Sequence, residues 1–118
     1  MIRIVEKPAE LVHGEDKKIT EYIGNVSTKT GGISIARIRH PEGWSEPGQT
    51  PEFDEYSIVL NGTLRLETKD ETFDLKPSQT AIIEKNTWVR YSTPHEGGAE
   101  YIAVCLPAFS LDIANRDQ

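Results

Sequence analysis

Apolar residues in this chain recur mostly at every second position, in short runs that are interrupted by glycine, proline and other turn residues. No window longer than about ten residues follows the 3.6-residue period of an amphipathic helix. Short alternating runs that end in turn residues are typical of β-strands. We therefore predict about nine strands, over residues 2–5, 19–26, 33–39, 53–60, 63–68, 72–75, 80–84, 88–92 and 101–106.

Turn and capping residues mark two further local structures. Asn61-Gly62 lies between two predicted strands and suits a type I′ turn, because both residue types tolerate positive φ, so a β-hairpin is predicted there. Residues 110–115 form the best helical candidate, with Ser110 as its N-terminal cap. A chain of 118 residues is long enough for one core. We predict a single all-β domain over 1–118, because so many short strands must close into a barrel or cover their edges.

The charge of the chain argues against two classes of partner. Its 13 Lys and Arg against 19 Asp and Glu give a net charge of -6, whereas nucleic acids and anionic membranes attract basic patches. We expect neither as a partner. No apolar run approaches the roughly 20 residues of a membrane span, and the first residues lack the apolar core of a secretory signal, so a cytoplasmic location is expected. The lone Cys105 lies in an apolar run and is predicted to be a buried, unreactive thiol.

The stretch from Gly43 to Gly62 has a spacing that resembles a known motif. Five of its residues fall where the first cupin motif places a glycine, two histidines, a glutamate and a closing glycine, namely Gly43, Gln49, Pro51, Glu55 and Gly62. The second cupin motif keeps only its strand, turn, strand rhythm here, and its signature positions carry Ser78, Glu84, Asn86, Val89 and Thr93. The chain thus resembles the small RmlC-like cupins, and is most similar among them to the ethanolamine-utilisation type.

The resemblance implies a cupin double-stranded β-helix, that is, a jelly-roll barrel, with its core over about 19–107. Cupins usually hold a divalent metal with three histidines and one glutamate. Here the histidine positions carry Gln49, Pro51 and Val89, and only Glu55 remains, so we predict no metal cofactor. The alternative is a rearranged, oxygen-rich site for a divalent metal, formed by Glu46, Gln49, Glu55 and His95.

Glu55 is the candidate catalytic residue. Strand alternation puts Phe53, Glu55, Ser57 and Val59 on one face, and the resemblance directs that face into the barrel. Loss of hydration in an apolar pocket would raise the pKa of Glu55 and make it an acid or base near neutral pH. The alternative is a buried acid without a catalytic part, satisfied by a local hydrogen bond or by an arginine.

Several other residues are candidates for binding a ligand. Tryptophans can stack on a ring, and arginines can bind a carboxylate or phosphate with two parallel hydrogen bonds. His13 and His40 lie in or beside polar loops and are expected to be exposed. The predicted ligand-binding residues are Gln49, Glu46, Tyr91, Ser57, Arg37, Arg90 and Trp88.

Three function classes remain open. The first is an isomerase, epimerase or lyase that acts on a small polar metabolite and uses Glu55 as acid or base. The second is a barrel that binds a ligand without turnover. The third is a scaffold whose apolar strand face, with Tyr56, Ile58 and Leu60, is buried in a dimer. A homodimer is compatible with all three classes.

Overall fold

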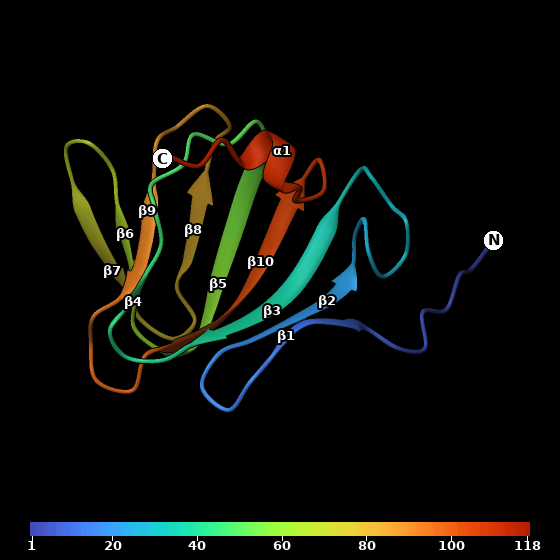
Figure 1. Ribbon diagram of the computed structural model, residues 1–118, viewed down its shortest axis with the longest axis horizontal. Helices are drawn as coiled ribbons and strands as arrows, with labels where there is room; N and C mark the ends of the chain where they lie inside the picture. Colours follow the sequence, from blue (N-terminus) through green and yellow to red (C-terminus); the bar gives the residue numbers. More distant parts are fainter.

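The computed structural model describes residues 1–118, which fold into two facing β-sheets and one short helix (Figure 1). The larger sheet has the order β1-β2-β3-β10-β5-β8 and the smaller one the order β4-β9-β6-β7, and every pairing is antiparallel. The strands of the larger sheet are β1 (Ala9–His13), β2 (Lys18–Ile23), β3 (Ser34–His40), β10 (Ala99–Leu106), β5 (Asp54–Gly62) and β8 (Thr80–Ile83). Those of the smaller sheet are β4 (Trp44–Ser45), β9 (Arg90–Thr93), β6 (Leu64–Glu67) and β7 (Thr72–Leu75).

The predicted hairpin at Asn61-Gly62 is wrong, because the two strands that it joins belong to different sheets. β5 pairs with β10 and β8, whereas β6 pairs with β7 and β9. The chain crosses between the sheets at Gly62, which has a φ of 74°. A Cβ on Gly62 would overlap the carbonyl of Gly98, and that same carbonyl accepts the N–H of Thr63 at 3.1 Å. Glycine is therefore required at a corner of the barrel and not in a tight turn.

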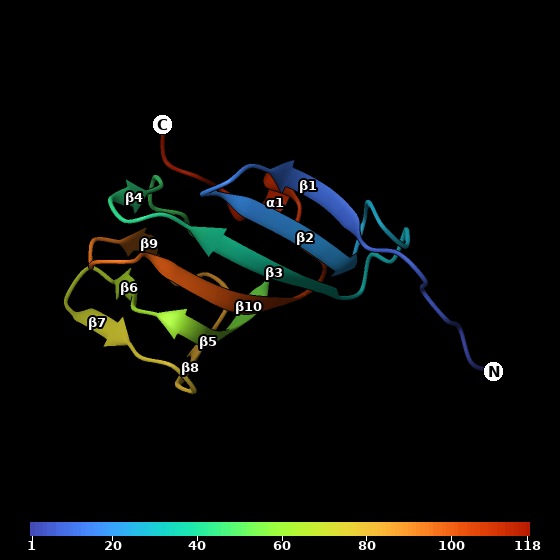
Figure 2. The same cartoon turned by 90° about the horizontal axis from the view of Figure 1, so that it is seen from below.

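The first strand also lies elsewhere than predicted. Residues 2–5 form no strand, and the first eight residues extend away from the barrel (Figure 2). β1 instead covers Ala9–His13, because the turn at Gly14 places those residues opposite β2. β4 was not predicted, since its two residues are too few to show a period. The predicted helix is confirmed: α1 (Leu111–Ala114) begins after Ser110, whose hydroxyl accepts the N–H of Asp112 at 3.2 Å. No helix here has the length and apolar character needed to cross a membrane.

The inner face of the larger sheet is lined by small side chains in its middle. The register aligns one residue from each of four neighbouring strands into a single row across that face: Ala36, Ala103, Ser57 and Ala81. Large side chains pack on either side of this row, with Val59, Leu64 and Leu66 in the main core and Phe53 in a second cluster beside α1. A hollow remains between the two sheets, because the row of small side chains does not fill it.

Candidate functional site

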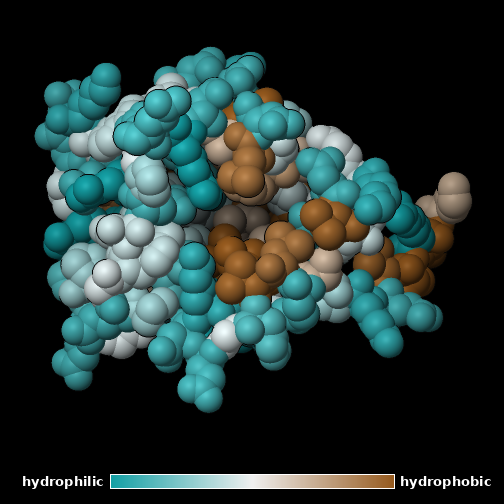
Figure 3. Space-filling view, viewed as in Figure 1, coloured by the Kyte–Doolittle hydropathy of each residue, from teal (hydrophilic) through white to brown (hydrophobic).

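The hollow is a cavity of about 580 Å³ inside the barrel. Figure 3 shows that the molecule is hollowed near its centre and that apolar side chains gather around this opening. Leu11 and Val12 of β1 and Leu111 of α1 belong to the lining, together with Ile19 and Ile38 deeper along the sheet. Polar and charged side chains also line it, from the turn before β2, from β2, β3, β4, β5, β9 and β10, from the segment after β4 and from the C-terminal tail. A cavity of this kind suits a small molecule that has both polar and apolar groups.

Glu55 lies in the wall of the cavity, where β5 pairs with β10 and β8. Its cross-strand neighbours are Cys105 and Ile83, and only 8% of the residue is exposed. Burial raises the pKa of the carboxyl from 4.5 to about 7, and the charge of Glu46 adds to this rise. The Tyr91 hydroxyl and the charge of Arg116 act in the opposite direction but do not cancel it. Both protonation states of Glu55 are therefore populated near neutral pH, which suits an acid or base.

Tyr91 reaches from the smaller sheet towards the row of small residues on the larger one. Its hydroxyl oxygen lies 2.9 Å from the hydroxyl oxygen of Ser57. Burial raises the pKa of Tyr91 well above its usual value of 10, and the charge of Glu55 adds to this, so the phenol stays protonated. Tyr101 lies beside it, with ring centroids 6.2 Å apart, and burial raises its pKa in the same way. The wall around Glu55 thus holds neutral hydroxyl groups that can donate to a ligand.

Glu46, Gln49 and Arg116 form a polar group that joins the segment after β4 to the C-terminal tail. The Nε of Arg116 lies 3.4 Å from the Oε1 of Gln49, and its Nη2 lies 3.5 Å from the Oε2 of Glu46. Burial raises the pKa of Glu46, although the charges of Arg116 and Lys17 oppose this. Arg116 was not among the predicted site residues. No local pattern marks it, because its place depends on where the tail folds back.

His40 is buried in the cavity wall, so the expectation that it is exposed is wrong. Only 4% of the residue is accessible, and its ring stacks on that of Trp44 with centroids 3.4 Å apart. Burial and the charge of Lys17 lower the pKa of His40 to about 4, so the imidazole is neutral, and its Nδ1 has no hydrogen-bond partner. Extending the alternation of β3 by one residue would have found it, since Ser34, Ala36, Ile38 and His40 all line the cavity.

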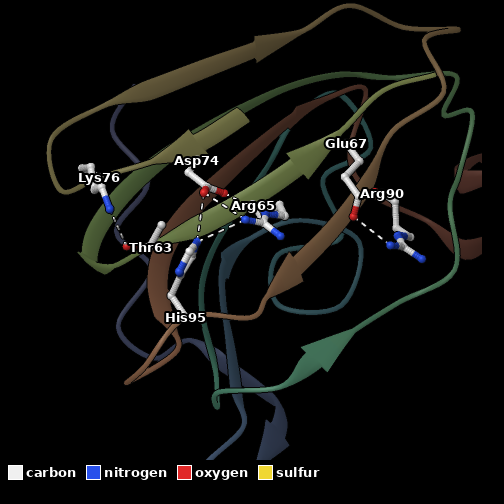
Figure 4. Close-up of polar contacts among 7 residues, drawn as sticks. All are labelled: Thr63, Arg65, Glu67, Asp74, Lys76, Arg90 and His95. Atoms are coloured by element: carbon white, nitrogen blue, oxygen red, sulfur yellow. Dashed lines mark hydrogen bonds and ion pairs between the residues drawn. The ribbon is translucent and has the colours of Figure 1, made fainter. Parts of the chain in front are cut away.

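Four of the predicted site residues lie outside the cavity. Arg37 pairs with Glu100 at 3.0 Å, and Trp88 donates its indole N–H to Asp117 at 2.8 Å. Arg90 pairs with Glu67 on the neighbouring strand at 2.7 Å, and His95 lies 2.9 Å from Asp74, which also binds Arg65 (Figure 4). Each of these four side chains is held by a neighbour away from the cavity, and none of them lines it. The residues that the structure places in the cavity wall are Glu46, Gln49, Glu55 and Tyr91, and Ser57 is buried beside them.

The residues present do not fit the metal that cupins usually hold. Pro51 and Val89 occupy two of the histidine positions and have no donor atom, and the oxygen of Gln49 faces the guanidinium of Arg116. A cation at that place repels a divalent metal. Of the four residues predicted for a rearranged site, Glu46, Gln49 and Glu55 line the cavity, whereas His95 lies outside it, 2.9 Å from Asp74.

One curated protein is similar in sequence, the endoribonuclease YbeY of Myxococcus xanthus. It is 34% identical over 112 residues, which are 94% of this chain but only 38% of that protein. No protein-family model matches the sequence. This chain therefore corresponds to well under half of that relative.

Several solved structures are similar in fold to this chain over most or all of its length. An RmlC-like cupin from Shewanella frigidimarina is 14% identical, with a TM-score of 0.72 and coverage of 94% of both chains. Pac13 of Streptomyces, a nucleoside dehydratase, is 14% identical with a TM-score of 0.73, over 100% of this chain and 91% of its own. The EutQ protein of Clostridium difficile is 18% identical with a TM-score of 0.63, over 80% of this chain and 66% of its own. Identities this low establish the fold alone, and they confirm it: the chain is a single-domain barrel of the RmlC-like cupin fold.

Proposed function

We propose that this barrel binds a small polar metabolite and moves a proton on it, as an isomerase, epimerase or lyase, with Glu55 as the acid or base. The observation that carries the proposal is the buried Glu55 in the cavity wall, with a pKa of about 7. A carboxyl with this pKa can both accept and return a proton at neutral pH, whereas an exposed glutamate is almost fully ionised there.

The hydroxyl groups beside Glu55 supply the second element of such a reaction. Removal of a proton from a carbon next to a carbonyl forms a carbon–carbon double bond and places negative charge on the carbonyl oxygen, as an enolate. Tyr91 and Tyr101 stay protonated in the buried wall, so their O–H groups can donate to that oxygen. The neutral hydroxyl groups thus stabilise the charge that Glu55 creates when it takes the proton.

The similar proteins support this class of reaction to different degrees. Pac13, a dehydratase, shows that a barrel of this fold can host an elimination. The endoribonuclease activity of the Myxococcus relative is not transferred to this chain, because most of that protein lies outside the match. The net charge of -6 also disfavours binding to a nucleic-acid backbone.

Substitution of Glu55 by glutamine tests the proposal. Metabolites that raise the melting temperature of the wild-type protein are selected first, and their turnover is followed by NMR. Glu55→Gln is expected to reduce turnover at least 100-fold while binding persists, because the amide cannot carry the proton. Glu84→Gln changes an exposed glutamate on the outside of the barrel and serves as the control. Binding without turnover in the wild-type protein favours the second candidate, a ligand-binding barrel.

The site is proposed to work without a metal. The support is that Pro51 and Val89, at two of the histidine positions, have no donor atom, and that the oxygen of Gln49, at the third, faces the guanidinium of Arg116. Elemental analysis of protein that is purified without chelator or added metal is the test. A stoichiometric transition metal that is lost in a Glu55→Ala variant would contradict the proposal.

A further inference from the structure

The end of the chain is tied across the segment that follows β4. Asp117 donates its backbone N–H to the carbonyl of Gly48 at 2.8 Å, and residue 115 accepts the N–H of Thr50 at 3.3 Å. The side chain of Asn115 donates to the Thr50 carbonyl at 3.0 Å, and the indole of Trp88 donates to Asp117. We name residues 115–117 the C-terminal strap. These bonds fix the backbone of Arg116, so its side chain reaches the cavity from a rigid support.

The guanidinium of Arg116 is only partly satisfied by the protein. It has five N–H donors, and its two bonds, to Gln49 and Glu46, are long at 3.4 and 3.5 Å. Its carbon atom lies 5.8 Å from the ring centre of Phe109, and 39% of the side chain remains exposed. The remaining donors are free to bind an acceptor that enters the cavity.

Two other polar groups in the cavity wall point to a bound ligand. Lys17 lines the cavity with Arg116, and the charges of both act on the carboxyl group of Glu46. His40 is 4% exposed and its Nδ1 has no partner, although buried polar atoms are nearly always hydrogen-bonded. A ligand with an acidic group satisfies the spare N–H donors of Arg116 and balances the charge of Lys17.

We propose that Arg116 selects ligands that carry an anionic group, a carboxylate or a phosphate, and holds that group at the mouth of the cavity. The inference rests on the proposed function, since it names the substrate class of the same cavity. Arginine suits the role because its planar fork matches two oxygens of a carboxylate or phosphate. The apolar lining around Leu11, Val12 and Ile38 then receives the uncharged body of the ligand.

Matched probe molecules test the anion preference by titration calorimetry. Benzoate, phenyl phosphate and benzamide share a ring and differ in the group offered to Arg116, and the two anions separate a carboxylate from a phosphate site. We expect the preferred anion to bind the wild-type protein with roughly 10- to 100-fold lower Kd than benzamide, the range of a charge-assisted hydrogen bond. Arg116→Gln should remove that preference, so that the anion no longer binds more tightly than benzamide.

Arg37→Gln provides the matched control, because Arg37 lies outside the cavity and pairs with Glu100. This control should bind all three probes as the wild-type protein does. Equal affinity of the wild-type protein for benzamide and both anions would overturn the inference, as would an anion preference that survives in Arg116→Gln. Neither result touches the proton-transfer role of Glu55, which depends on the turnover of Glu55→Gln. Failure of all three probes to bind overturns the inference as well.

Discussion

At the scale of single residues, Glu55 should make the protein less stable as the pH rises from about 4.5 to about 7. In this window the folded state keeps a proton on Glu55, because burial raises its pKa, whereas the unfolded chain has released it. The unfolded state binds fewer protons there, so the free energy of unfolding falls with pH, by on the order of 3 kcal/mol, and levels off above the folded pKa. Urea unfolding at pH 4.5, 6 and 8 measures this decrease in the free energy of unfolding.

Glu55→Gln should remove most of this pH dependence. A smaller slope of the same sign is expected to remain from Glu46, whose pKa burial also raises. Glu84→Gln should keep the full slope, since that glutamate is exposed. An unchanged slope in Glu55→Gln would show that the carboxyl is not held in its neutral form by the fold.

Tyr91→Phe should raise the pKa of Glu55 further. The Tyr91 hydroxyl is one of the groups that lower this pKa, so its loss leaves the carboxylate with less support. The substitution also leaves the buried hydroxyl of Ser57 without its hydrogen-bond partner, which costs about 1–3 kcal/mol of stability. Carbon-13 NMR titration of the Glu55 carboxyl measures the shift, and Tyr22→Phe, at an exposed position on β2, is the control. A lower pKa in Tyr91→Phe would contradict the assigned role.

At the scale of elements, the crossing between β5 and β6 should depend on glycine more than other turns do. Gly62 has a φ of 74° and no room for a Cβ beside the Gly98 carbonyl, whereas Gly43 has a φ of 84° and open space around it. Alanine at Gly43 should cost about 1–2 kcal/mol for the left-handed conformation alone. Gly62→Ala adds the overlap with the backbone and should cost clearly more, as measured by urea unfolding. If Gly62→Ala and Gly43→Ala lost the same free energy of unfolding, the backbone around Gly62 would accommodate the Cβ without strain.

The same crossing explains why the strands were predictable and their pairing was not. Alternation along residues 53–60 correctly placed Glu55 and Ser57 inside, because the period of a strand is a local property. The partner of a strand is not local. β5 joins β10 from the far end of the chain, and this pairing forbids the hairpin that Asn61-Gly62 suggests.

At the scale of the whole molecule, the residues that line the cavity come from segments that are far apart in the sequence. The cupin spacing led to Glu55 and Gln49, and strand alignment led to Tyr91. Arg116 was unpredictable, because only the folded tail brings it to Gln49. Arg37 and Arg90 were predicted for the ligand site by their chemistry alone, but each pairs with a glutamate on a neighbouring strand outside the cavity.

The outer face of the larger sheet leads to the last prediction, that the protein is a homodimer. Register aligns Ile35, Val104, Tyr56 and Ile82 in one row on this face, with Ile58 and Ile102 in the next. Ile82 is 69% exposed and Ile58 36%, which is a large apolar area for an isolated sheet. We propose that a second copy of this chain covers the face, because a self-complementary apolar patch is the usual interface of a two-fold dimer.

Ile58→Lys should convert the dimer into a monomer. The substitution places a charge at the centre of the proposed interface but on the surface of each folded subunit, so the melting curve of the monomer should stay cooperative. Light scattering coupled to size-exclusion chromatography gives the mass of each variant. Val26→Lys changes an exposed valine in the turn after β2 and should remain dimeric. A wild-type mass of 13.2 kDa at micromolar concentration would show that the apolar face stays uncovered, and the homodimer would then be wrong.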